Sequence, residues 1–141
     1  MKTPQLTPYL IFKDNCRAAM QFYQQCLGGQ LDIQTFTGTP AAEHVPADAQ
    51  DGVLHARLEN ENIVLFGSDA GSQPVMEGNN VALSLNCGSD EEIESYYARL
   101  TEGGNVTMPL ADTFWSAKFA MFTDQFGISW MLNYDKNEAG Q

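Results

Sequence analysis

Apolar residues recur along this chain in two ways, one helical and one strand-like. Two segments carry them on one side of a helix with a period near 3.6, and these are residues 16–27 and 90–101. In the first segment the apolar side is formed by Cys16, Ala19, Met20, Tyr23 and Leu27, with Phe22 and Cys26 beside it, and in the second by Ile93, Tyr96, Tyr97 and Leu100. Strand-like runs occupy residues 6–12, 31–36, 53–58, 62–67, 81–87, 105–110, 117–123 and 128–134.

Residues typical of helix N-caps and helix C-termini flank both predicted helices. Asp14 and Asn15 precede the first helix and Ser89 and Asp90 the second, and these side chains are typical of N-caps. Each helix is followed by a glycine pair, 28–29 or 103–104, and glycine tolerates the backbone geometry that ends helices. We also expect Asp112 to cap a turn, and residues 124–127 (DQFG) to form a hairpin turn with glycine in a positive φ.

The order of the elements is β-α-β-β-β, written twice. We therefore predict one α+β domain over residues 1–141, made of two βαβββ modules at about 5–70 and 79–135. The halves differ most at residues 38–52, a Pro-, Ala- and Asp-rich stretch that we expect to be a mobile loop covering a cavity. Residues 68–78 are predicted to link the modules.

Charge and composition restrict the classes of partner. The formal net charge is −11, which repels phosphate backbones and disfavours nucleic acid; it favours a cationic ligand, although an acidic surface also serves plain solubility. No apolar run approaches the roughly 20 residues of a membrane span, and residues 1–15 do not resemble a secretory signal, so we expect a cytoplasmic protein without a membrane partner. The three cysteines are too scattered for a zinc site or a disulfide framework.

Several short segments carry a family resemblance that extends over essentially the whole chain. They are LTPYLIF (6–12), FYQQCLGG (22–29), DTFW (112–115), DQFG (124–127) and WMLN (130–133). With them the chain resembles the PhnB-like branch of the glyoxalase/bleomycin resistance/dioxygenase group, also called the vicinal oxygen chelate superfamily. The resemblance implies modules whose sheets curl into half-open cups, a small-molecule ligand in the cup, and a homodimer.

Metal-using members of this superfamily place one His, Gln or Glu ligand on the first and the fourth strand of each module. Aromatic rings and thioethers are poor ligands for Mg²⁺, Mn²⁺, Ni²⁺ or Zn²⁺. We therefore predict no metal and no other cofactor. The residues that stand at the four places here are Thr7 and Tyr9, Leu65 and Phe66, Asn80 and Ser84, and Trp130 and Met131.

A ligand-binding role is predicted for a few side chains, each of which also has a plainer interpretation. His55 alternates with Val53 and Arg57 on one face of a strand, where it serves as a base, a polar anchor or simply a hydrogen-bonded strand histidine. Trp115, next to Phe114, forms either a stacking wall or a hydrophobic plug or dimer contact. Met121 and Met131 either line a ligand or fill the core. The predicted ligand-binding residues are Tyr9, His55, Phe66, Ser84, Trp115, Met121 and Met131.

Three functional hypotheses follow. The first is a metal-free, homodimeric protein that binds an unidentified small organic molecule, and it assigns no catalytic residue. The second is a metal-dependent lyase, isomerase or dioxygenase with ligands from elsewhere, for instance Glu43, His44 or Asp48 in the long loop, although His44 is more typical of a solvated side chain. The third is sequestration of a cationic antibiotic, which the negative charge and Trp115 favour weakly. Whether the protein is an enzyme stays open.

Overall fold

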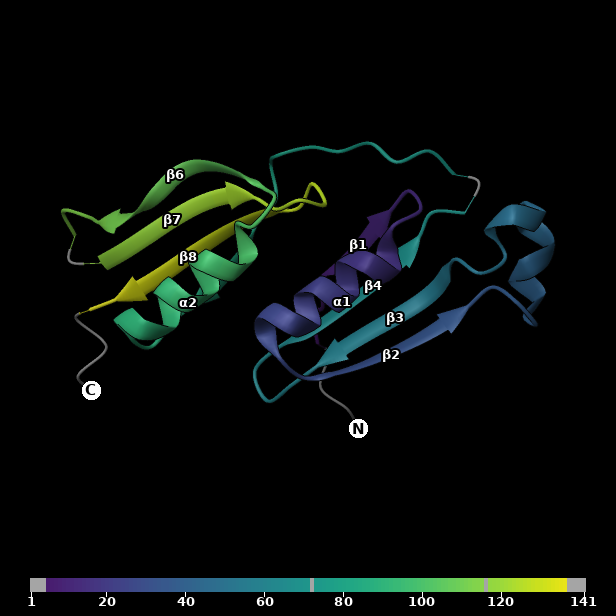
Figure 1. The fold of residues 1–141 in the computed structure, drawn as a ribbon, viewed down its shortest axis with the longest axis horizontal. Helices are drawn as coiled ribbons and strands as arrows, with labels where there is room; N and C mark the ends of the chain where they lie inside the picture. The colour runs from purple at the N-terminus through teal and green to yellow at the C-terminus, as the bar shows by residue number, and fades with distance from the viewer. Residues whose placement is uncertain (1–4, 72, 116, 137–141) are drawn as a thin grey trace. The chain divides into compact units, whose positions relative to one another are not determined.

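The computed structural model describes residues 5–71, 73–115 and 117–136. The chain divides into two compact units, Met1–Met76 and Glu77–Gln141, and each is described here by itself. In each unit one helix lies against a four-stranded sheet (Figure 1).

The first unit contains β1 (Tyr9–Phe12), α1 (Cys16–Leu27), β2 (Gln30–Thr35), β3 (Val53–Glu59) and β4 (Val64–Asp69). Its strands are ordered β1-β4-β3-β2. The outer pair β1–β4 is parallel and the other two pairs are antiparallel. Helix α1 packs on β2, β3 and β4.

The second unit repeats this topology with β5 (Leu83–Asn86), α2 (Asp90–Leu100), β6 (Asn105–Asp112), β7 (Ala117–Thr123) and β8 (Ser129–Asp135). Its order is β5-β8-β7-β6, again with one parallel pair, β5–β8, and two antiparallel pairs. Helix α2 packs on β8. The predicted duplication of a βαβββ module with mixed sheets is confirmed.

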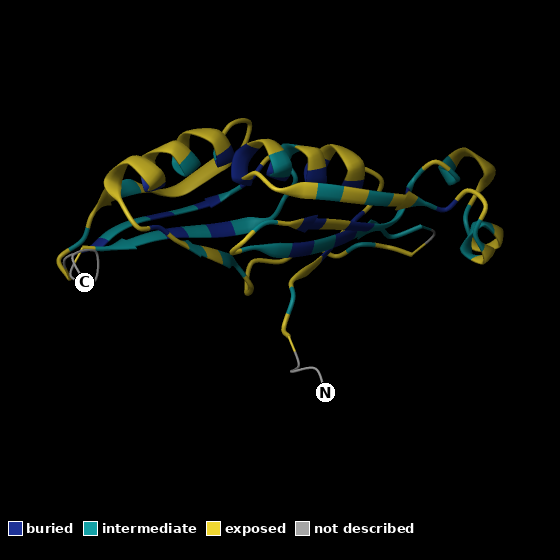
Figure 2. Cartoon of the chain, turned by 90° about the horizontal axis from the view of Figure 1, so that it is seen from below, coloured by how far each residue is buried: buried dark blue, intermediate teal, exposed yellow. Residues whose placement is uncertain are grey.

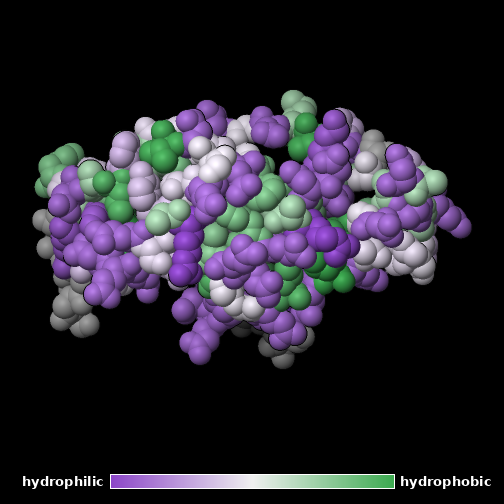
Figure 3. Space-filling view, in the orientation of Figure 1, coloured by the Kyte–Doolittle hydropathy of each residue, from purple (hydrophilic) through white to green (hydrophobic). Residues whose placement is uncertain are grey.

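Each unit has its core between helix and sheet, as the bands of buried residues in Figure 2 show. The stripe predicted for α1 is confirmed, since it supplies Cys16, Ala19, Met20, Tyr23, Cys26 and Leu27 to that core. Helix α2 buries Ile93 and Leu100 and leaves Tyr96 and Tyr97 half-buried. Its outer side is mainly hydrophilic (Figure 3). No helix in the described ranges has the length and apolarity needed to cross a membrane.

The two helices begin in different ways. Ser89 caps α2 as predicted, because its Oγ accepts a hydrogen bond of 3.1 Å from the backbone N–H of Glu92. Asn15 occupies the N-cap position of α1 but makes no capping hydrogen bond with its side chain. A carboxylate from β4 takes over this role, since Asp69 accepts from the N–H of Cys16 at 2.9 Å and from that of Val53 at 2.8 Å. The prediction that Asp14 or Asn15 caps α1 is therefore wrong, because Asp69 accepts this hydrogen bond.

The glycine pairs that end the helices are needed for both backbone conformation and space. The first glycine of each pair has a positive φ, 78° at Gly28 and 74° at Gly103, and Gly29 has one as well, 114°. The second lies against a neighbouring strand. A Cβ on Gly29 would lie 2.6 Å from the carbonyl oxygen of Glu59, and one on Gly104 would lie 2.4 Å from that of Thr123. Side chains are therefore excluded at these second positions by backbone contact.

The long loop contains two short 3₁₀ helices, Pro40–His44 and Ala47–Ala49, and the side chain of Gln50 holds them by donating to the carbonyls of Ala42 (2.8 Å) and Val45 (3.1 Å). The predicted mobility of this loop stays a prediction. Two other expectations about connecting segments need correction. Ser68 and Asp69, placed in the linker by sequence, belong to β4.

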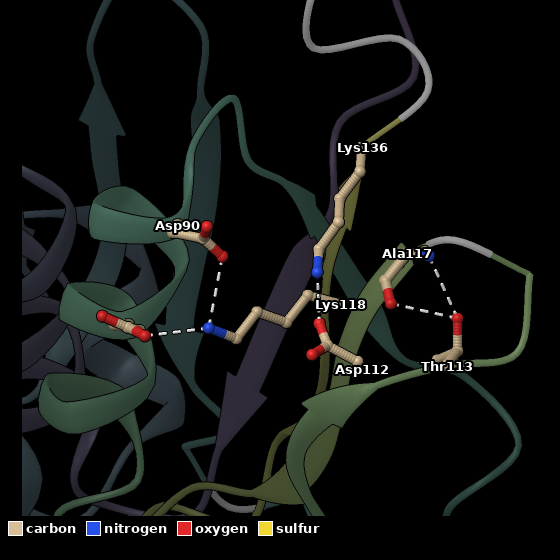
Figure 4. A network of polar contacts seen from close by, with 7 residues as sticks. Asp90, Asp112, Thr113, Ala117, Lys118 and Lys136 are labelled. Carbon is tan, nitrogen blue, oxygen red and sulfur yellow. Dashed lines mark hydrogen bonds and ion pairs between the residues drawn. The ribbon is translucent and has the colours of Figure 1, made fainter.

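The second correction concerns Asp112, which lies within β6 and forms an ion pair with Lys136 (Figure 4). The neighbouring turn is held by Thr113 instead. Its N–H donates to the carbonyl of Ala117 at 2.8 Å, and its Oγ1 accepts from the N–H of Ala117 at 3.1 Å.

Candidate functional site

The face of each sheet that is turned away from its own helix is called the open face. In the first unit the two faces are distinguished at Gly67, where a Cβ would lie 3.1 Å from Sδ of Met20 and 3.3 Å from Sγ of Cys16 on α1. Strand alternation then places Phe66 on the open face. Tyr9 lies there too, because it is the register partner of Phe66 in the parallel pair β1–β4.

Three of the predicted residues form a cluster on this open face. The Tyr9 hydroxyl and Nδ1 of His55 share a hydrogen bond of 3.3 Å, and their rings lie 5.7 Å apart between centroids. Phe66 contacts both, with its ring edge-on to Tyr9 at 6.1 Å and to His55 at 5.0 Å. These residues come from β1, β3 and β4, so the sheet brings together a phenol, an imidazole and a phenyl ring from distant parts of the sequence.

A cation flanks the cluster. Arg57, the register partner of Phe66 on β3, holds its guanidinium 5.9 Å from the centre of that ring and forms an exposed ion pair with Glu59. The prediction that Val53 shares a face with His55 and Arg57 is wrong. The register shifts between Gln34 and Thr35, which interrupts the alternation, and Val53 is fully buried whereas His55 is half-buried.

In the second unit the helix side is marked by Phe122, whose ring meets that of Tyr97 on α2 at 6.4 Å. Its register partner Trp130 shares that side and is buried. Alternation therefore places Met121 and Met131, which pair with each other across β7 and β8, on the open face.

A straight row of side chains crosses this second sheet. Ser84 on β5 pairs with Met131, Met131 with Met121, and Met121 with Met108 on β6. Ser84, Met121 and Met131 were predicted as ligand-binding residues, and the structure brings them into one row. Met108 was missed, because two register shifts in β6 decide which of its residues opposes Met121 and no sequence signal marks them.

Trp115 lies apart from that row, at the end of the β6–β7 hairpin. Its ring packs edge-on against Phe114 at 4.8 Å and against Phe119 at 6.4 Å. Both residues are well exposed, Trp115 at 52% and Phe114 at 95%. The interpretation as a plug within the chain is therefore wrong, and a stacking wall or a contact with another molecule stays a prediction.

The four positions that bear on metal binding are now defined by register. On the first and fourth strand of each unit the candidate residues form two directly opposed open-face pairs, Tyr9 with Phe66 and Ser84 with Met131; the next open-face pairs along the strands are Ile11 with Ser68 and Asn86 with Asn133. Leu65 and Trp130, the alternatives weighed from sequence, are buried on the helix side. Two aromatic rings, a hydroxyl and a thioether do not fit a divalent cation.

Ligands from elsewhere do not assemble a metal site either. Among the described residues there is no group of three or more His, Cys, Asp or Glu side chains placed to hold an ion. Glu43, His44 and Asp48 are exposed in the 3₁₀ segments of the long loop.

A pocket of about 550 Å³ lies elsewhere in the first unit, between the start of α1, the long loop and the end of β4. None of the seven predicted ligand-binding residues lines it. Its lining consists of Lys13, Asp14, Asn15, Arg17, Ala18, Gln21, Phe36, Asp48, Ala49, Asp51, Gly52, Val53, Asp69 and Gly71.

The cysteines offer no ready nucleophile. Burial, together with the nearby negative charge of Asp69, raises the pKa of the Cys16 thiol to about 12. Burial and the charge of Glu92 raise that of Cys87 to about 11. Both thiols are protonated at neutral pH, which agrees with the inert, buried role predicted for Cys87.

Comparison with known proteins yields matches over nearly the full chain. A model of the Glyoxalase/Bleomycin resistance protein/Dioxygenase superfamily matches residues 5–132. Protein YjdN of Escherichia coli (strain K12) is 30% identical over 145 residues, covering 96% of this chain and 99% of that protein.

Solved structures match the fold. The crystal structure of protein PA1353 from Pseudomonas aeruginosa has a TM-score of 0.84 and 43% identity, covering 94% of this chain and 98% of that one. A Bacillus cereus structure described as a putative 3-demethylubiquinone-9 3-methyltransferase, PhnB protein, has a TM-score of 0.76 at 23% identity and covers 93% and 99% of the two chains. At that identity the second likeness concerns the fold alone.

Proposed function

Because this chain belongs to the glyoxalase/bleomycin resistance protein/dioxygenase superfamily, we propose that it binds a small organic molecule on its open sheet faces without a divalent metal ion. One observation carries the proposal. The directly opposed open-face pairs on the first and fourth strands are Tyr9 with Phe66, Ile11 with Ser68, Ser84 with Met131 and Asn86 with Asn133, and they contain neither a carboxylate nor an imidazole. Divalent cations such as Mn²⁺, Ni²⁺ and Zn²⁺ depend on such ligands in sites of this kind.

The same side chains suit an organic ligand well. Pockets for small molecules combine apolar and aromatic walls with a few polar groups that set orientation. In the first unit Phe66 supplies a wall, and the hydrogen-bonded pair of Tyr9 and His55 supplies the polar group. In the second unit the methionine row supplies an adaptable, polarisable wall that ends at the hydroxyl of Ser84.

Two features of the proposal come from the family rather than from geometry. The PhnB-like branch, suggested by the motifs of the sequence, agrees with the fold likeness to the Bacillus cereus protein. Members are commonly homodimers, and we extend this to the present chain, with a cytoplasmic location. Size-exclusion chromatography with light scattering tests the dimer, because it should return twice the mass of the chain, and the mass of one chain would refute it.

The alternatives have less support. A metal-dependent lyase, isomerase or dioxygenase needs a ligand set that the described residues do not assemble. Sequestration of a cationic antibiotic draws on the net charge of −11 and on the exposed ring of Trp115. It is a special case of the proposed binding function, and a ligand screen that includes cationic drugs distinguishes it.

Binding is tested by screening a library of small organic molecules, cationic antibiotics included, for protection of the untagged protein against thermal unfolding. Hits are then titrated against Phe66→Leu and Met131→Leu, two substitutions on the open faces, and against Met76→Leu as control, since Met76 is 94% exposed in the linker. The proposal predicts at least tenfold weaker binding for one open-face variant and no change for the control. Equal affinities in all proteins, or hits that contact the pocket beside α1 instead, would contradict it.

A further inference from the structure

Three thioethers lie side by side on the open face of the second unit. Met121 on β7 has Met108 on β6 as its register partner on one side and Met131 on β8 on the other. The three strands lie next to one another (Figure 1). Half of the six methionines in the chain therefore meet in one cross-strand row.

The spacing of this row allows the three sulfurs to converge. Directly opposed residues on neighbouring strands have Cβ atoms about 4.5–5.5 Å apart. A methionine side chain has three rotatable bonds, so the outer two, Met108 and Met131, can lean toward Met121 and bring their sulfurs above it. The row is also accessible, since Met108 is 46% exposed and the other two are half-buried.

The chemistry of the row is selective. A thioether is a neutral, soft ligand that prefers Cu(I) among biological cations and holds hard divalent ions poorly. The nearest open-face neighbours on β5, β7 and β8 are Ser84, Phe119, Thr123, Ser129 and Asn133, which offer no carboxylate, imidazole or thiolate to attract harder ions. The net charge of −11 adds a general attraction for cations that needs no specific contact.

From this juxtaposition we propose that Met108, Met121 and Met131 form a three-thioether site for a soft monovalent cation, Cu(I). This inference goes beyond the proposed function, because it concerns a soft metal ion instead of an organic ligand, although both proposals use the methionine row of the second unit. Other soft groups of the described chain are less suited to compete. Met20 is fully buried between α1 and the first sheet, and Met76 lies in the linker. The thiols of Cys16 and Cys87 are buried and protonated at neutral pH.

The test follows methionine methyl resonances in the full-length protein labelled with ¹³C at the methionine methyl groups. Ag(I), a redox-stable soft probe, and Cu(I) under anaerobic reducing conditions are titrated separately. The proposal predicts that one equivalent shifts the methyl signals of Met108, Met121 and Met131 together and leaves that of Met76 in place. Competition with a chromogenic Cu(I) chelator gives the affinity, which should fall at least tenfold in Met121→Leu and stay unchanged in Met76→Leu.

Leucine keeps the volume of methionine, so the fold should persist, and Met131→Leu replaces Met121→Leu if the amide spectrum of the latter shows unfolding. Two results would overturn the proposal. One is the absence of any shift in the three methyl signals at one equivalent, including the case in which Cu(I) binds only to cysteines. The other is full Cu(I) affinity in a folded variant that lacks the Met121 or the Met131 thioether. Neither result affects the organic-ligand screen, so the two proposals fail separately.

Discussion

Trp130 donates a hydrogen bond from Nε1 to Oδ2 of Asp124 over 2.8 Å, and both side chains are only 3% exposed. The other carboxylate oxygen accepts from the backbone N–H groups of Phe126 (2.8 Å) and Ile128 (3.1 Å), which closes the turn between β7 and β8. This contact commits Trp130 to the helix side of its sheet. Because side chains alternate along a strand, Met131 then lies on the open face, at a position where the family resemblance implies a ligand in metal-using members.

We predict that Asp124→Ala destabilises the protein by about 3 kcal/mol, because it removes charge-assisted hydrogen bonds and leaves buried donors unpaired. Urea unfolding measures the change. Asp112→Ala is the matched control in the same unit, since its carboxylate forms an exposed ion pair with Lys136, and it should destabilise the protein much less than Asp124→Ala. Equal costs for the two substitutions would show that the buried turn does not hold the hairpin.

Neighbouring residues on β8 should respond very differently to truncation. Leu132 is fully buried on the helix side, so Leu132→Ala should cost about 2–5 kcal/mol in unfolding free energy. Met131 is half-buried on the open face, so Met131→Ala should cost no more than about 1 kcal/mol. Chemical denaturation of both variants compares them directly, and a larger loss for Met131→Ala would mean that the faces are assigned the wrong way round.

Gly104 is expected to tolerate no side chain. A Cβ there would lie 2.4 Å from the carbonyl oxygen of Thr123, a backbone atom that cannot move without disturbing β7, so Gly104→Ala should cost about 2–3 kcal/mol. Gly88 has open space around its Cβ position, and Gly88→Ala should change stability by less than about 0.5 kcal/mol. Melting temperatures rank the pair, and a neutral Gly104→Ala would refute the close approach.

Stability should fall in alkaline solution partly because of Cys16. Burial is the main cause that raises the pKa of this thiol in the folded protein to about 12, and the charge of Asp69 is the second. A cysteine in an unfolded chain has a pKa of about 8.5. Above the unfolded pKa the unfolded chain releases a proton that the folded chain keeps, so the free energy of unfolding decreases as pH rises toward 12.

Urea titrations of the wild type and Cys16→Ala between about pH 8 and pH 10 check this. The variant should be less stable at each pH because of its lost packing, but its stability should decline less steeply. Parallel curves would show that ionisation of Cys16 does not contribute.

The two helices and the glycines at their C-terminal ends were predictable because a strong apolar period and glycine pairs are local signals. The first residues of the strands were harder to predict. β1 begins at Tyr9 and β5 at Leu83, later than the apolar runs suggest, because the parallel ladder with β4 or β8 decides where pairing starts. The cap of α1 by Asp69 joins residues far apart in the chain and has no local signature.

For the candidate site, strand alternation pointed to His55 and the family resemblance pointed to Tyr9 and Phe66, but their mutual contacts depend on the order of strands in the sheet. Register shifts account for the errors. One shift in the β2–β3 pair separates Val53 from His55, and others in the β6–β7 pair bring Met108 opposite Met121. Bulges of this kind are tertiary features that alternation of residue types does not reveal.

The most direct test of the account is divalent metal binding by the untagged, metal-depleted protein. Isothermal titration with Mn²⁺, Ni²⁺ and Zn²⁺, followed by dialysis and elemental analysis, should show no stoichiometric ion retained, because Tyr9, Phe66, Ser84 and Met131 occupy the candidate ligand positions on the open faces of the first and fourth strands. One equivalent of a divalent ion that survives dialysis, and that is lost in His55→Ala or Tyr9→Phe, would contradict the account.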